Sequence, residues 1–120
     1  MRWRVPSAIV GTCVILATPS FADSVNPYPP AYCAALWEGY ADVLGDKGER
    51  ALAAQFREAS VQLIGEAETD ASIAERRPWM VDLIYAYIYH QDDQSRHIFE
   101  RLVRGCGDLA GDLSLIGPED

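Results

Sequence analysis

The sequence predicts a small all-α domain of four helices, a bundle-like fold closed by one disulfide and preceded by a cleaved signal peptide. Three observations lead to this prediction. Apolar residues recur at spacings of three and four along residues 31–108. Capping residues and glycines divide this stretch into four segments of helical length. Two cysteines, Cys33 and Cys106, lie near its opposite ends.

The first 22 residues have the organisation of an export signal. Arg2 and Arg4 precede a 13-residue apolar run over 5–17, and small residues stand before the expected cleavage after Ala22. A transmembrane helix needs about 20 apolar residues, so this run is too short to span a membrane comfortably. An uncleaved anchor and a lipoprotein signal acylated at Cys13 remain as alternatives. We expect a periplasmic or secreted protein.

The charge of the expected mature chain restricts its partners. Cleavage leaves 98 residues, enough for one domain, with eight basic and 18 acidic residues and a formal net charge of −10. Such a surface repels nucleic acids and anionic lipids. The sequence therefore predicts no nucleic-acid partner and no stable membrane insertion after cleavage.

The cysteine pair predicts a structural disulfide. Cleavage removes Cys13 and leaves Cys33 and Cys106, which would pair in an oxidising compartment. Closing a loop of roughly 74 residues removes unfolded-state entropy equivalent to about 4 kcal/mol, comparable with the stability of a small domain. A redox-active or metal-binding pair is the alternative, but the Cys-x-x-Cys spacing of such sites is absent.

The first predicted helix follows a proline-rich leader over residues 23–30, which we expect to be extended. It begins after Pro30 and ends at Gly45, and its apolar residues follow helical spacing: Cys33, Leu36, Trp37, Tyr40 and Leu44. Gly39 inside it costs up to about 1 kcal/mol relative to alanine. This cost is tolerable if a neighbouring helix packs closely there.

The second and third helices are predicted on either side of a turn over 72–77. After the loop at 46–48, the second helix carries one apolar face made of Leu52, Phe56, Leu63 and Ala67. Ser72 and Glu75 have the spacing of a capping box, and Pro78 suits the first position of a helix that runs to about His90. Residues 83–89 are also rich in strand-favouring types, but they have no partner strand.

The fourth helix is predicted to start at a cluster of capping residues, Asp92, Asp93 and Ser95. Its apolar face is made of Ile98, Phe99, Leu102, Val103 and Cys106, and Gly105 and Gly107 should end it. The helical domain would then cover residues 31–108, and residues 109–120 would form a C-terminal tail.

No motif for catalysis, metal binding or nucleotide binding is present, so we expect neither an enzyme nor a cofactor. His90 and His97 lie seven residues apart across a predicted turn, which does not match the i, i+3 or i+4 spacing of ligands on one helix face. Capping explains Asp92 and Asp93 without a metal. Neighbouring carboxylates on an exposed face share one environment, which is unsuited to paired acid and base roles.

Aromatic residues are the candidate binding residues because Tyr and Trp often anchor interfaces. Two are predicted on the first helix and four on the third: Trp37, Tyr40, Trp79, Tyr85, Tyr87 and Tyr89. Packing of these rings in a small core is the alternative. Three tyrosines at period two on a helix cannot all face one way, so at least one should be exposed.

These features together predict a non-enzymatic envelope protein that binds another protein or an apolar client. The build is similar in outline to that of periplasmic acid-stress chaperones of bacteria, although no motif residues carry this similarity. Two other classes remain as alternatives. An inhibitor or immunity-type protein would block a basic cleft of a partner enzyme with its negative surface. A carrier would hold a small ligand or a metal.

Overall fold

The computed structural model describes residues 28–115 of the 120-residue chain. The predicted signal peptide and its cleavage site lie outside the described residues. Within them the chain forms α2 (Pro30–Leu44), α3 (Glu49–Ile64), α4 (Glu66–His90) and α5 (Asp93–Asp112), and this part of the chain contains no strand. The all-α prediction with four helices is confirmed.

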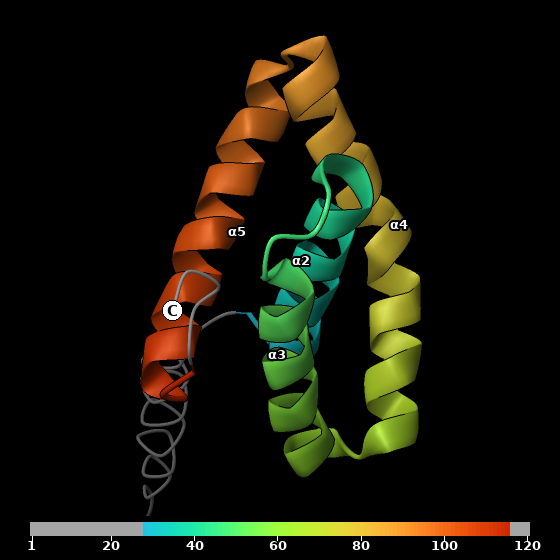
Figure 1. Cartoon of the computed structure of the whole chain (residues 1–120), viewed down its shortest axis with the longest axis vertical. Helices are drawn as coiled ribbons and strands as arrows, with labels where there is room; N and C mark the ends of the chain where they lie inside the picture. Colours follow the sequence, from blue (N-terminus) through green and yellow to red (C-terminus); the bar gives the residue numbers. More distant parts are fainter. Residues whose placement is uncertain (1–27, 116–120) are drawn as a thin grey trace, which may run out of the picture.

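Helix α2 lies between the other three helices (Figure 1). Helices α3 and α4 connect at the lower end of the molecule in this view, and α4 and α5 meet at the upper end like the arms of an inverted V. Side chains from all four helices fill the core, and the largest fully buried apolar ones are Leu36, Phe56, Met80 and Ile84. Most of the other buried residues of α2 are small, which lets its neighbours approach closely: Ala31, Ala34, Ala35, Gly39 and Ala41.

Local signals explain the ends of α2 and α3. Pro30 occupies the first position of α2, and Gly45 ends this helix as predicted, with a φ of 93° that an L side chain rarely adopts. The Asp46 carboxylate accepts hydrogen bonds of 3.0 Å from the backbone N–H groups of Gly48 and Arg50 at the start of α3. Gly65, with a φ of 89°, ends α3 and leads directly into α4.

Gly39 allows α2 and α4 to cross in close contact. A Cβ atom on this residue would lie 2.9 Å from the Cβ of Met80 and 3.3 Å from the backbone nitrogen of Val81. Real Cβ atoms essentially never approach a neighbour as closely as the first distance. The close helix packing that would make a glycine tolerable at this position is therefore present.

The predicted turn over 72–77 is wrong, because α4 is one continuous helix through Pro78. The proline lacks an N–H group and so removes one helical hydrogen bond, at a cost of about 3 kcal/mol. Packing on both sides offsets this cost, since Ile73 precedes Pro78 in the core cluster and Met80 follows it. The strand alternative for 83–89 is also wrong, because these residues lie inside the same helix.

Two residues of the predicted face of the second helix are not buried. Leu63 is 69% exposed, and Ala67 is an exposed residue of α4 because α3 already ends at Ile64. Contact between the two helices at this end is polar: the hydroxyl groups of Ser60 and Thr69 share a buried hydrogen bond of 2.7 Å. The predicted apolar face included Ala67, but the chain turns at Gly65, so Ala67 does not continue the face of α3.

The fourth helix starts as predicted but ends later. The Asp92 carboxylate accepts hydrogen bonds from the backbone N–H of Ser95 at 2.8 Å and from its hydroxyl at 2.7 Å. The prediction that Gly105 and Gly107 end the helix is wrong, because α5 continues to Asp112 and buries Leu109. The ring of Tyr28 occupies the place that a side chain at position 105 would need.

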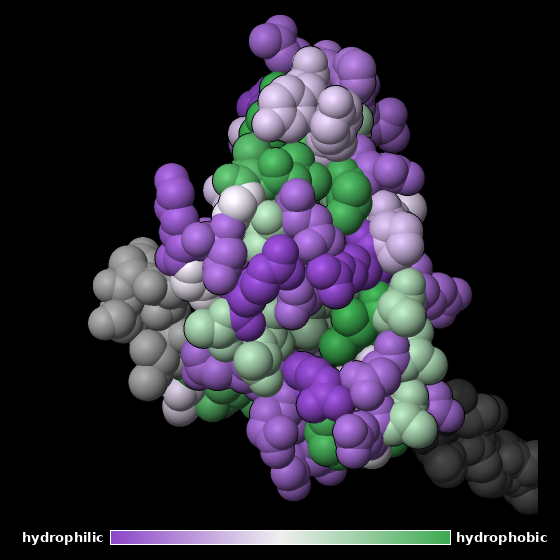
Figure 2. Space-filling view, turned by 45° about the vertical axis from the view of Figure 1, so that its right-hand side comes forward, coloured by the Kyte–Doolittle hydropathy of each residue, from purple (hydrophilic) through white to green (hydrophobic). Residues whose placement is uncertain are grey.

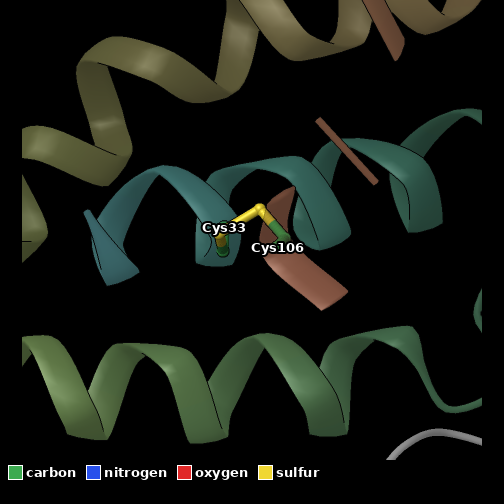
Figure 3. Close-up of a disulfide and its surroundings, with 2 residues drawn as sticks. All are labelled: Cys33 and Cys106. Atoms are coloured by element: carbon green, nitrogen blue, oxygen red, sulfur yellow. A yellow bond between two sulfur atoms is a disulfide. The ribbon is translucent and has the colours of Figure 1, made fainter. Parts of the chain in front are cut away.

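The predicted disulfide between Cys33 and Cys106 is confirmed. It joins α2 to α5 across 73 positions of sequence, with a Cα–Cα distance of 5.6 Å (Figure 3). Both cysteines are fully buried in the core cluster. Among the described helices, none is both long enough and apolar enough to cross a membrane.

Candidate functional site: the outer face of α4

The six aromatic candidates separate into an inner and an outer group. Trp37, Tyr40 and Tyr87 are half-buried. Trp37 and Tyr40 pack against the core cluster, and Tyr87 packs against Phe99. Trp79, Tyr85 and Tyr89 are 44%, 49% and 55% exposed. The expectation that the three tyrosines of α4 cannot all face one way is therefore confirmed.

The inner group joins three helices through ring contacts. Ring centroids of Trp37 and Tyr40 on α2 lie 5.6 Å apart, and Phe99 of α5 lies 6.1 Å from Tyr40 and 5.4 Å from Tyr87 of α4. Aromatic pairs at these distances stabilise a fold beyond their buried area. This cluster packs α5 against α2 and α4 near the end of the molecule where α4 and α5 meet, and its geometry is that of a structural contact.

The outer group lies on one side of the longest helix. We define the outer α4 face by Trp79, Asp82, Tyr85 and Tyr89. Successive residues of a helix are rotated by about 100°, so Asp82 lies in the middle of this face, with Trp79 and Tyr85 about 60° to either side. The rings of Tyr85 and Tyr89 contact each other at 4.7 Å, and the ring of His90 lies 5.6 Å from that of Tyr85.

The upper part of the molecule carries weakly polar and apolar surface. Figure 2, in which α4 is turned toward the viewer, shows large pale side chains near the upper end above a band of green ones. Three of the five exposed large hydrophobic residues in the described chain belong to the outer α4 face. The other two are Leu63 and Ile64, at the C-terminal end of α3.

Asp82 was not among the sequence-predicted site residues. It is exposed, and within residues 28–115 it forms no ion pair and no hydrogen bond through its side chain. Its spacing to the aromatic candidates, three residues after Trp79, three before Tyr85 and seven before Tyr89, is the signal that could have identified it.

The two arginines of α4 point to α2 and leave the outer face without a cation of their own. Arg76 donates a 2.6 Å hydrogen bond to the Tyr32 hydroxyl, and its guanidinium carbon lies 4.2 Å from the centroid of that ring. Arg77 donates two hydrogen bonds, at 2.7 and 2.9 Å, to the Asp42 carboxylate.

On the side of α4 that faces α2, ion pairs connect α2, α3 and α4. Glu38 and Asp42 of α2 both pair with Arg50 of α3, at 2.6 and 3.2 Å, and with Arg77 of α4, at 3.7 and 2.7 Å. The side chains of Glu38 and Asp42 are only 25% and 26% exposed. The hydrogen bonds from Arg77, opposed by partial burial and supported by Arg50, hold the pKa of Asp42 below its usual value.

A second pairing joins α3 to the start of α4. Arg57 donates hydrogen bonds of 2.9 and 3.0 Å to Asp70, and it contacts Glu66 at 3.4 Å. Hydrogen bonds from Arg57 also lower the pKa of Asp70. A hollow of about 250 Å³ opens between these helices, lined by Arg57, Asp70, Glu38 and Arg77 over an apolar floor. Its charged groups already pair with one another or with Asp42, so the hollow offers a ligand no unsatisfied partner.

Catalytic and metal chemistry receive no support from the arrangement of the described side chains. Among residues 28–115, no group of three or more His, Cys, Asp or Glu side chains is placed to hold a metal ion. Cys33 and Cys106, the two cysteines in the described part of the chain, are bonded to each other and are not available as thiols. No protein-family model, curated protein or solved structure matches this chain.

Proposed function

We propose that this protein is a non-enzymatic, exported protein that binds another protein or an apolar client through the outer α4 face. The observation that carries the proposal is the exposure of Trp79, Tyr85 and Tyr89, each more than two fifths exposed on one side of a single helix. Large aromatic side chains dominate the binding energy of protein interfaces because they desolvate much surface with few rotatable bonds.

The rigid setting of this face supports a binding role. Met80, Leu83 and Ile84 on the opposite side of α4 are buried in the core. Their packing fixes the position of the helix that carries the outer face. Because the backbone of this helix is already ordered, a partner that covers the face does not have to order it, which lowers the entropic cost of binding. Export rests on the sequence of residues 1–22, and the Cys33–Cys106 disulfide is consistent with an oxidising compartment.

Affinity capture from a bacterial envelope extract tests the proposal. The bait proteins are the wild type, a variant with Trp79→Ser, Tyr85→Ser and Tyr89→Ser, and a control with Leu63→Ser and Ile64→Ser. The control removes the other exposed apolar side chains, which lie on a different element. Circular dichroism and thiol titration establish that all three baits keep their helices and their disulfide.

We expect the wild type and the control to capture one or more proteins that the α4 variant does not capture. One protein recovered in equimolar amount would indicate a dedicated partner, whereas many unfolded proteins would indicate a client-binding role. Equal recovery by the wild type and the α4 variant would refute the proposed role of this face.

A further inference from the structure

The chemistry of the outer α4 face indicates which kind of partner it would bind. Its aromatic residues surround one carboxylate, Asp82, which has no cation partner among the described residues. Other carboxylates that are at least partly exposed, such as Asp42 and Asp70, already pair with arginines of this chain. Asp82 therefore differs from these two carboxylates in having no cation partner within residues 28–115.

A second carboxylate extends the negative character of this side of α4. Glu75 precedes Asp82 by seven residues and Tyr89 follows it by seven, so the three lie nearly in line along the helix. Glu75 is exposed and also forms no ion pair within the described part of the chain. The arginines Arg76 and Arg77 next to it are occupied by Tyr32 and Asp42 of α2.

Arginine matches this arrangement better than any other side chain. Its guanidinium group is planar, donates paired hydrogen bonds to a carboxylate and stacks on aromatic rings, whereas a lysine ammonium is a strongly hydrated point charge. Cation–π contacts and charge-assisted hydrogen bonds would act on the same group here, because Trp79 and Tyr85 flank Asp82. The formal net charge of −8 for the whole chain also favours encounter with a basic partner.

We propose that the outer α4 face docks an arginine-bearing basic segment of a partner protein, with a guanidinium group paired with Asp82 and packed against the flanking rings of Trp79 and Tyr85. This inference rests on the proposed function and assigns the chemistry of the partner. A purely apolar client and a second copy of this chain are the competing occupants.

Binding of defined peptides to the oxidised protein tests this inference directly. Three fluorescent peptides share one length and sequence in which glycine alternates with arginine, lysine or citrulline. Citrulline keeps the shape of arginine and removes its charge. Fluorescence anisotropy at low ionic strength gives the Kd of each peptide, and sedimentation velocity reports whether the protein itself dimerises.

Two variants of equal charge provide the matched comparison. Asp82→Asn removes the central carboxylate, and Asp108→Asn removes an exposed carboxylate of α5 that also has no ion pair within residues 28–115. We expect the arginine peptide to bind more tightly than the lysine peptide, with the citrulline peptide weakest. Asp82→Asn should weaken arginine-peptide binding about fivefold, and Asp108→Asn less than about twofold. Tyr85→Leu should reduce the preference for arginine over lysine.

Several results would overturn the inference. These are equal effects of the two asparagine variants, equal binding of the arginine and citrulline peptides, no binding of the arginine peptide at millimolar concentration, and dimers that Asp82→Asn abolishes. If envelope proteins are still captured through the aromatic residues in any of these cases, the proposed function stands and only the partner chemistry is wrong. If the arginine peptide binds through Asp82 while no envelope protein is retained, the proposed function fails.

Discussion

The close crossing of α2 and α4 predicts opposite effects for two glycine-to-alanine substitutions. In an open helix position, replacing glycine by alanine stabilises the helix by up to about 1 kcal/mol. Gly107 of α5 is such a position, since a Cβ there would meet no atom within 4 Å. Gly107→Ala should therefore raise the free energy of unfolding by about that amount.

Gly39→Ala should lower the free energy of unfolding despite the same gain in helix propensity. The new Cβ would lie 2.9 Å from the Cβ of Met80, an atom attached directly to the α4 backbone, and 3.3 Å from the backbone nitrogen of Val81. Neither atom can rotate away, so the two helices must separate. Overpacking of this kind costs about 1–3 kcal/mol, which leaves a net loss of about 1 kcal/mol after the gain in propensity.

The two variants should therefore differ by about 2 kcal/mol in stability and by roughly 10 °C in Tm. Urea titration and thermal melts followed by circular dichroism at 222 nm measure both quantities. An unchanged slope of the urea transition would show that only stability has changed. If Gly39→Ala stabilised the protein as much as Gly107→Ala does, the close approach of α2 and α4 would be refuted.

Two further predictions concern the disulfide and the ion pairs. Replacing Cys33 and Cys106 together by alanine should lower the free energy of unfolding by about 4 kcal/mol, measured by urea titration, and an unchanged midpoint would contradict this. The pKa of Asp42 is lowered in the folded protein, so its contribution is present above the unfolded pKa near 4 and is lost as pH falls through the lower folded value. The free energy of unfolding should therefore decrease below about pH 4. Asp42→Asn should weaken this pH dependence and lower the free energy of unfolding by about 1 kcal/mol at pH 7. If the variant showed the same pH dependence as the wild type, the assigned role of Asp42 would be wrong.

Local signals in the sequence were enough for much of the fold. Gly45 and Asp92 end and begin helices as predicted, because each acts on backbone groups within one turn of its own position. The pairing of Cys33 with Cys106 could also be predicted, since removal of Cys13 with the signal would leave no other thiol. These features depend on residue type and short spacing alone.

The candidate site was only partly predictable. The sequence identified the aromatic residues of α4, but it could not say that Tyr87 packs against Phe99 while Tyr85 and Tyr89 face outward. Asp82 also looked like any other surface carboxylate. Its lack of an arginine partner on α4 became visible only when the directions of Arg76 and Arg77 were known.

Residue types and their spacing were sufficient to predict the helical class, most helix starts and the cysteine pair. Tertiary structure alone decided that α4 continues through Pro78, that Leu63 stays exposed and which side of α4 is left uncovered. The two groups of features depend on interactions that act over different distances along the chain. Caps and helix propensities act over one or two turns, whereas burial depends on contacts between segments far apart in the chain, and these contacts can offset a local cost of about 3 kcal/mol such as that of an interior proline.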